Sequence, residues 1–263
     1  MTNLHVCLIQ TDLVWENIPQ NLQHIEEKIN QVTNGTHLVV LPEMFSTGFS
    51  MQPEKLAETM QGSTIEWMKR IAATKKIILT GSLIIQKNNH FYNRLIWMLP
   101  NGQMGKYDKR HCFAYAGEHK QYTPGSSRFI ASVNGWKINL QICYDLRFPV
   151  WARQKTLHPP EYDVLLYVAN WPEKRIHAWK SLLVARAIEN QCYVIGVNRV
   201  GKDGNGIAHS GDSMAINPMG ETIWHESNRE AIGQVVLDAS FLQEVRTKFP
   251  FLDDADTFTI HHA

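Results

Sequence analysis

Cys143 is the residue whose type and position first suggest covalent chemistry. It lies where the apolar run WKINLQIC gives way to the helix-like segment YDLRFPVWARQKT. A helix that begins at such a junction favours the thiolate form of a cysteine, and its first backbone N–H groups can bind an oxyanion. The other interpretation is a core cysteine, because a buried thiol packs as a small hydrophobic group. Cys7 and Cys192 lie within apolar runs and fit that second interpretation.

Three charged residues could assist a cysteine nucleophile. Glu43 ends the apolar run HLVVLPE, where burial would suit a carboxylate to act as a general base. Lys109, in GKYDKRHCF, could donate to an oxyanion, and Glu118 could orient that lysine or assist proton transfer. Each also has an ordinary structural interpretation. Glu43 could face solvent or cap the next segment, and the other two could be solvated loop residues.

Other catalytic patterns are missing from the sequence. It contains no G-x-S-x-G elbow, no G-x-x-x-x-G-K-[ST] phosphate loop and no H-E-x-x-H helix. The four cysteines form no C-x-x-C pair, and His261 and His262 stand at the extreme end of the chain, where fraying is favoured over metal binding. The sequence therefore predicts neither a metal nor another cofactor.

The order of apolar and amphipathic segments predicts an α/β layered fold. Strand-like runs such as LHVCLIQ and DVLLYVANWP alternate with segments that have helical spacing. We expect helices over residues 17–32, 64–76 and about 174–190, and a hairpin within residues 91–109 that turns at Pro100-Asn101-Gly102. A long ordered loop is expected from Lys106 to Ser127. No linker or repeat interrupts the pattern, so one domain over residues 1–263 is predicted.

Composition favours a small-molecule partner. The chain has 263 residues, of which 44% are hydrophobic, and 26 basic against 25 acidic residues leave a formal charge of +1. Nucleic acid or an anionic membrane surface would be bound through clustered Lys and Arg, which this balance does not provide. The first residues lack the features of a secretory signal, and no apolar run approaches the roughly 20 residues needed to cross a bilayer. We therefore expect a cytoplasmic protein that binds neither nucleic acid nor membrane.

The candidate residues stand in segments that together resemble the nitrilase (carbon–nitrogen hydrolase) superfamily. These segments are LPEMF around Glu43, GKYDKRHCF around Lys109, Gly117-Glu118 followed by YTPG, and QICYDLRFP around Cys143. The resemblance runs from LIQTDLVWENIPQN to the NPMGE turn. Within the superfamily, ICYDLRFPVWAR, VANWPEKR, ARAIENQCYVIGVNRVG and FPFLDDADTF are most similar to the bacterial ω-amidases of the YafV type.

The resemblance implies a fold, an assembly and a set of roles. The fold would be a four-layer αββα sandwich that forms a homodimer, with the C-terminal tail in the dimer packing. Aromatic-rich segments such as RFPVWAR and HAWKSLL add weak support for a dimer, since a small monomer would have to cover them. Cys143 would attack the amide carbonyl, Glu43 would transfer protons, and Lys109 with the backbone N–H of Tyr144 would hold the oxyanion. The resemblance also implies a second glutamate beside this triad, and Glu118 matches its position.

The implied substrates are α-keto dicarboxylate monoamides, α-ketoglutaramate and α-ketosuccinamate, whose carboxylate needs a local cation. Arg175 follows the strand end VANWPEK and can bind a carboxylate in a bidentate manner, although it could instead begin the next helix and be solvated. Arg147 is the other candidate, unless it pairs with an acid such as Asp145. Trp171 would supply an apolar wall for the methylene chain.

Two alternatives to an ω-amidase are kept. The same residues could serve an N-carbamoyl amidohydrolase or a broad aliphatic amidase, in which an N-carbamoyl substrate would release carbon dioxide as well as ammonia. A noncatalytic binding protein with this fold is a more distant alternative. The simultaneous presence of Glu43, Lys109, Cys143 and Glu118 argues against it.

Overall fold

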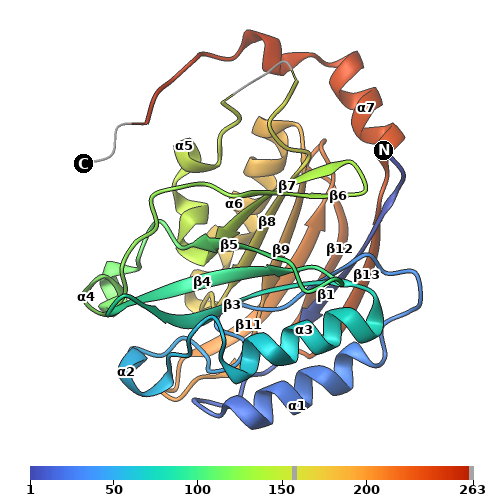
Figure 1. Ribbon diagram of the computed structural model, residues 1–263. Helices are drawn as coiled ribbons and strands as arrows, with labels where there is room; N and C mark the ends of the chain where they lie inside the picture. Colours follow the sequence, from blue (N-terminus) through green and yellow to red (C-terminus); the bar gives the residue numbers. More distant parts are fainter. Residues whose placement is uncertain (156–158, 261–263) are drawn as a thin grey trace.

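The computed structural model describes residues 1–155 and 159–260, so the predicted fraying of His261 and His262 concerns residues outside this range. Two β-sheets pack face to face, and helices cover the outer face of each (Figure 1). This is the predicted four-layer αββα sandwich. Within the described ranges, no helix is long and apolar enough to cross a membrane.

The first sheet has a parallel centre and antiparallel edges. β1, β2 and β3 are parallel neighbours, while β13, β4 and β5 extend the sheet through antiparallel pairs. Among the described residues its spatial order is β13 (Ala231–Leu237), β1 (Leu4–Gln10), β2 (Leu38–Val40), β3 (Ile78–Lys87), β4 (His90–Met98) and β5 (Met104–Asp108). The β4–β5 pair confirms the predicted hairpin.

The second sheet repeats this arrangement. β7, β8 and β9 are parallel neighbours, and the remaining pairs are antiparallel. In the described part of the chain its order is β10 (Val200–Lys202), β11 (Ala208–Ile216), β9 (Tyr193–Asn198), β8 (Val164–Ala169), β7 (Trp136–Ile142) and β6 (Ile130–Val133), with β12 (Thr222–Ser227) also paired to β11.

The outer layers consist of helices that lie against opposite sides of the sandwich (Figure 1). α1 and α3 cover the first sheet, and α5 and α6 cover the second. The α-helices are α1 (Ile18–Ile29), α2 (Pro53–Leu56), α3 (Ser63–Lys75), α4 (Glu118–Gln121), α5 (Pro149–Ala152), α6 (Ile176–Asn190) and α7 (Ala239–Lys248). The 3₁₀ helices are η1 (Ala114–Ala116), η2 (Cys143–Arg147), η3 (Glu173–Arg175) and η4 (Phe251–Asp254).

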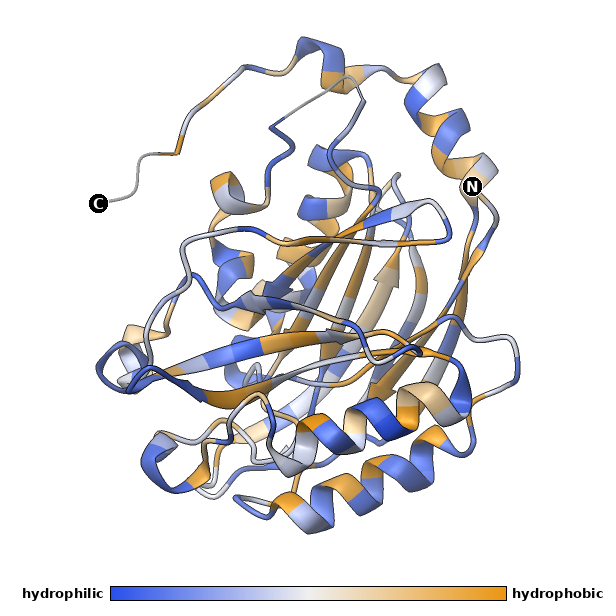
Figure 2. Cartoon of the chain, in the orientation of Figure 1, coloured by the Kyte–Doolittle hydropathy of each residue, from blue (hydrophilic) through white to orange (hydrophobic). Residues whose placement is uncertain are grey.

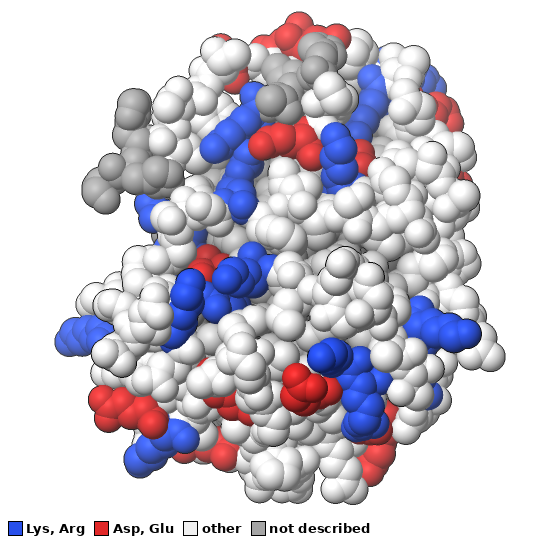
Figure 3. All heavy atoms as spheres, in the orientation of Figure 1, with Lys and Arg blue, Asp and Glu red and all other residues white. Residues whose placement is uncertain are grey.

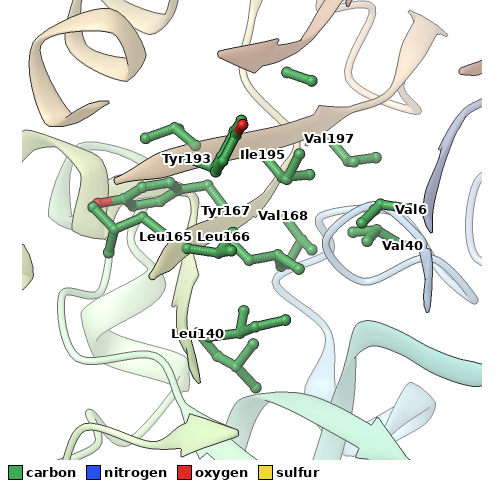
Figure 4. Close-up of a cluster of buried hydrophobic side chains, with 14 of the residues drawn as sticks. Val6, Val40, Leu140, Leu165, Leu166, Tyr167, Val168, Tyr193, Ile195 and Val197 are labelled. Carbon is green, nitrogen blue, oxygen red and sulfur yellow. The ribbon is translucent and has the colours of Figure 1, made fainter. Parts of the chain in front are cut away.

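The alternation of side chains along β1 shows why its sequence is apolar almost throughout. Val6 and Leu8 point into the core between the sheets, whereas Cys7 and Ile9 pack on the other face with residues of α1 and α3. Figure 4 shows Val6 in the core between the sheets, with side chains of β7, β8 and β9. Hydrophobic colouring accordingly dominates the central strands, while the outer helices mix both colours (Figure 2).

Three parts of the fold differ from the sequence prediction. The helix-like segment after Cys143 consists of two short pieces, η2 and α5, because Pro149 starts a new turn. The predicted loop 106–127 begins as the end of β5 and contains η1 and α4. β6, β12 and α7 were not expected. For β12 the reason is that the strand is largely exposed and lacks an apolar face.

Candidate active site

The predicted catalytic residues meet where several strands end at one edge of the sandwich. Glu43 lies just beyond β2, Lys109 follows β5, and Cys143 follows β7. Such positions at the carboxyl ends of strands commonly form binding sites in α/β proteins. Glu43 and Glu118 are 0% exposed, Lys109 is 1% exposed and Cys143 is 9% exposed. The surface interpretations of Glu43, Lys109 and Glu118 are therefore wrong.

Lys109 is held between the two glutamates. Its Nζ donates to Glu43 Oε1 at 2.9 Å and to Glu118 Oε1 and Oε2 at 3.0 and 2.9 Å. The ring of Phe49 also lies 5.1 Å from Nζ. An ammonium group has three N–H donors, so binding one donor to each carboxylate leaves one for a ligand.

Burial and charge act in opposite directions on this cluster. Burial alone would lower the pKa of the Lys109 ammonium, but the carboxylates of Glu118 and Glu43 raise it well above its ordinary value. Burial raises the pKa of Glu118, and Lys109 opposes that shift. Lys109 thus stays charged at neutral pH.

Glu43 is fixed through both carboxylate oxygens. Oε1 accepts from Asn93 Nδ2 at 2.8 Å as well as from Lys109, and Oε2 accepts from the backbone N–H of Asn170 at 2.8 Å. The side chain of Asn170 also donates to the backbone carbonyl of Glu43. The carboxylate is therefore held in one orientation by strands of both sheets.

Cys143 occupies a sharp turn between β7 and η2. Its φ of 44° is in the left-handed region, which a residue other than glycine adopts only when its surroundings impose it. The carboxylate of Asp145 stabilises this turn by accepting from the backbone N–H of Ile142 at 3.0 Å and from the hydroxyl of Tyr107 at 2.7 Å. Tyr144 is the second residue of η2, where backbone N–H groups have no partner within a helix.

The thiol does not have the lowered pKa that the helix start suggests. Burial raises the pKa of Cys143 well above its ordinary value, and the charge and hydrogen bonding of Glu43 raise it further, against the opposing effect of Lys109. The expectation of a thiolate favoured by the helix is therefore wrong, because η2 is short and the site is buried beside carboxylates. A resting thiol needs a base, and Glu43 is in position to be one.

A pocket opens beside Cys143 and contains all four predicted substrate-binding residues. Tyr144, Arg147, Trp171 and Arg175 line it together with Cys143. The other lining residues are Phe49, Phe113, Ala116, Asn170, Pro172, Asp203, Ile207 and His209. Their side chains are mostly apolar or aromatic, as is typical of a pocket for a small organic molecule.

The two arginines of the pocket stack on aromatic rings and form no ion pair with any carboxylate of the described residues. The Arg147 guanidinium lies 5.0 Å from the Trp171 ring, and the Arg175 guanidinium lies 5.3 Å from Phe113 and 5.8 Å from Tyr115. Asp145 binds Tyr107, His111 and the Ile142 N–H. The suggested Arg147–Asp145 pair is therefore not formed. Arg175 stands at the start of α6, as the alternative interpretation expected, but it also lines the pocket.

The sequence did not reveal the roles of three residues that organise this site. Asn93 is a polar residue in the middle of a buried strand, Asn170 directly follows β8 much as Glu43 follows β2, and Asp145 comes two residues after the nucleophile candidate. Asparagine is rare inside strands, so Asn93 carried a detectable signal. Among the described residues, no cluster of His, Cys, Asp and Glu is arranged to hold a metal ion.

Comparison with known proteins identifies the family of this chain. The model of the carbon–nitrogen hydrolase family matches residues 5–247. The chain belongs to this family. It is 42% identical over 261 residues to the ω-amidase YafV of Escherichia coli K12, covering 99% of this chain and 100% of that protein. It is 33% identical over 252 residues to the 2-oxoglutaramate amidase of Bacillus subtilis, covering 95% and 96%.

A solved structure agrees with the architecture. XC1258 of Xanthomonas campestris, described as a CN-hydrolase superfamily protein with an arsenic adduct in its active site, superposes with a TM-score of 0.97 at 38% identity. The match covers 99% of this chain and 100% of that one. The carbon–nitrogen hydrolase described here is thus an amide-hydrolysing enzyme. A purely noncatalytic role is wrong.

The geometry predicts selective alkylation of Cys143. Iodoacetamide, itself a small amide, should modify Cys143 at least about tenfold faster than the other cysteines, because the adjacent Glu43 can take the thiol proton. Burial raises the pKa of Cys7, Cys112 and Cys192 to about 12, and none of them forms a hydrogen bond to a carboxylate of the described residues. Mass spectrometry after brief labelling measures the order in which the four cysteines are alkylated. Glu43→Gln should remove the advantage, and equal labelling of all four thiols in the wild type would contradict the assignment.

Proposed function

We propose that this enzyme is an ω-amidase that hydrolyses the terminal amide of α-keto dicarboxylate monoamides, α-ketoglutaramate and α-ketosuccinamate, to the keto diacid and ammonia. The observation that carries the proposal is the pocket beside Cys143, in which Arg147 and Arg175 lack acidic partners among the described residues. A substrate that carries a carboxylate would supply that partner. The names of the relatives, ω-amidase and 2-oxoglutaramate amidase, support the same substrate class.

In the proposed first half-reaction, Cys143 Sγ forms a bond to the amide carbon while its proton passes to the Glu43 carboxylate. The remaining N–H of Lys109 and the backbone N–H of Tyr144 would bind the developing oxyanion. When the tetrahedral intermediate collapses, the C–N bond breaks and Glu43 returns the proton to the leaving nitrogen. Ammonia departs and a thioester remains on Cys143.

In the second half-reaction a water molecule attacks the thioester. Glu43 takes a proton from the water, the C–S bond breaks, and the proton returns to Cys143 as the acid is released. Glu118 binds Lys109 through both carboxylate oxygens, so it keeps Nζ aimed at the reacting carbonyl throughout. This sequence of steps needs only the side chains of the cluster and water.

The distal end of the pocket would hold the substrate carboxylate. Arg175 is stacked on Phe113 and Tyr115, which fixes the plane of its guanidinium for bidentate binding. Trp171 is 3% exposed, and its indole Nε1 donates to the backbone carbonyl of Arg175 at 2.9 Å. The wall that would contact the methylene chain is therefore attached to the segment that carries the cation.

We also propose that the enzyme is a cytoplasmic homodimer. The aromatic segments taken as weak support do not carry this proposal, because Trp151 and Trp179 are buried within the chain. Exposed apolar side chains on the outer helices support it better, since Val150 on α5 is 55% exposed and Ile188 on α6 is 53% exposed. A second copy that packs on this layer would cover both, with the C-terminal tail contributing to the packing.

A substrate panel tests the reaction. The purified enzyme should release ammonia from α-ketoglutaramate and α-ketosuccinamate with a higher kcat/KM than from neutral aliphatic amides, nitriles or N-carbamoyl compounds. Cys143→Ala should abolish turnover while leaving Tm nearly unchanged, because it removes the nucleophile but only one buried sulfur atom. Preferred release of carbon dioxide together with ammonia from an N-carbamoyl compound would instead establish the carbamoyl alternative.

Arg175→Ala tests how the carboxylate is bound. Its KM for α-ketoglutaramate should rise at least about tenfold, equivalent to about 1.4 kcal/mol of binding free energy, with much less effect on a neutral amide of the same length. Arg147→Ala is the matched control, since this arginine also stacks on an aromatic ring of the same pocket. Equal losses for both substrates, or a selective loss only in Arg147→Ala, would contradict the role of Arg175.

Sedimentation tests the assembly. At micromolar concentration the sedimenting species should have about twice the 30.2 kDa mass of the chain. Val150→Lys combined with Ile188→Lys should shift it toward the monomer, because both substitutions place charge in the proposed interface. A 30.2 kDa species alone in the wild type would contradict the dimer.

A further inference from the structure

The side chain of Asn93 lies beside both glutamates at the centre of the active site. This residue is on β4, is 1% exposed and pairs with Ile84 of β3. Its Nδ2 donates to Glu43 Oε1 at 2.8 Å and to Glu118 Oε1 at 3.3 Å. One amide group thus contacts both carboxylates, although nothing in the reaction described above requires it to touch the substrate.

Asn93 and Lys109 form a closed ring of hydrogen bonds with the two carboxylates. Lys109 Nζ donates to the same two oxygens, at 2.9 Å to Glu43 Oε1 and 3.0 Å to Glu118 Oε1. The backbone carbonyl of Asn93 also accepts from the backbone N–H of Lys109 at 2.9 Å. Asn93 therefore contacts every charged member of the cluster, through its side chain or its main chain.

The orientation of the Asn93 amide has an evident cost. With Nδ2 directed at the carboxylates, Oδ1 is buried and has no hydrogen-bond partner within the described ranges. A buried acceptor without a partner is normally avoided because its lost hydration is not replaced. The reverse orientation would place Oδ1 against two carboxylate oxygens, which repel it when they are ionised. The observed arrangement fits a pair of glutamates that both carry charge.

Two ionised carboxylates beside one ammonium group need a further donor. Burial and the nearby charge of Glu43 raise the pKa of Glu118, and one lysine cannot neutralise two negative charges. A second cation would neutralise the pair but would also compete with Lys109 for the oxyanion. A neutral amide with two N–H groups stabilises both negative charges without adding a charge of its own.

We propose that Asn93 is a positioning residue that keeps the Glu43 and Glu118 carboxylates ionised and correctly placed around Lys109. The inference rests on the proposed role of Glu43 as the base. It adds that the lower pH limit of the enzyme is set in part by an uncharged residue on β4. Removing the donor makes it harder to hold two negative charges side by side, so the active form of the enzyme needs a higher pH.

The experiment compares pH profiles of Asn93→Ala, Asn93→Leu and the wild type. In both variants the acidic limb of kcat/KM should move up by about one pH unit or more. Asn93→Leu nearly keeps the size of the side chain and removes the donor without adding a charge, so it tests the effect if the alanine variant fails to fold. The matched control is Asn139→Ala, which removes another buried asparagine whose Oδ1 accepts from Gln141 Nε2 at 3.0 Å, on β7. This control should lower Tm without moving the limb.

A second readout does not depend on the substrate. The rate at which iodoacetamide alkylates Cys143 should show the same shift of its acidic limb, because the thiol also requires an ionised Glu43. This shift would be seen even if α-ketoglutaramate proves not to be the substrate, so the two proposals can fail separately. Loss of rate by the same factor at every pH in both Asn93 variants, with unmoved limbs, would overturn the proposal and leave Asn93 a packing residue.

Discussion

The buried ion cluster of Lys109 with Glu43 and Glu118 is the constraint on which the rest of the site depends. Taking three charges out of water is expensive, and the attraction between them offsets this cost only when the geometry is tightly defined. Removing Lys109 would leave two buried carboxylates without a cation, which is strongly destabilising. The fold must therefore hold these side chains rigidly before any substrate arrives, and that requirement explains why Glu43 and Lys109 closely follow strands and Glu118 begins α4.

The sandwich meets this requirement by bringing the ends of both sheets together. Glu43 belongs to the first sheet, yet its Oε2 is bound by the backbone of Asn170 at the end of β8 in the second. Cys143 follows β7, which neighbours β8, in a left-handed conformation that the turn around Asp145 enforces. Face-to-face packing of the sheets thus fixes the distance between base and nucleophile, and the apolar core between them carries that geometry.

Much of this arrangement could be predicted from the sequence, because buried parallel strands and amphipathic helices have strong patterns. The strand that ends near Glu43, the hairpin before Lys109 and the junction at Cys143 were all visible in this way. The pKa of the thiol was not, since it depends on burial and on a carboxylate far away in the chain. Asn93 was missed for a related reason: its role comes from contacts across 50 residues to Glu43 and 25 residues to Glu118.

Electrostatic asymmetry along the pocket links the chemistry to the proposed substrate. The chemical end holds one ammonium and two carboxylates, while Arg147 and Arg175 line the same pocket as unpaired cations in the described part of the chain. Charges are interspersed over the face of the molecule in Figure 3, and the net charge is +1, so no long-range field sorts substrates. Orientation must then be decided within the pocket. A monoamide would place its neutral amide beside the carboxylates and its anionic end beside the arginines. Hydrolysis then converts the neutral end into a second carboxylate next to Glu43, and repulsion between the two favours departure of the product.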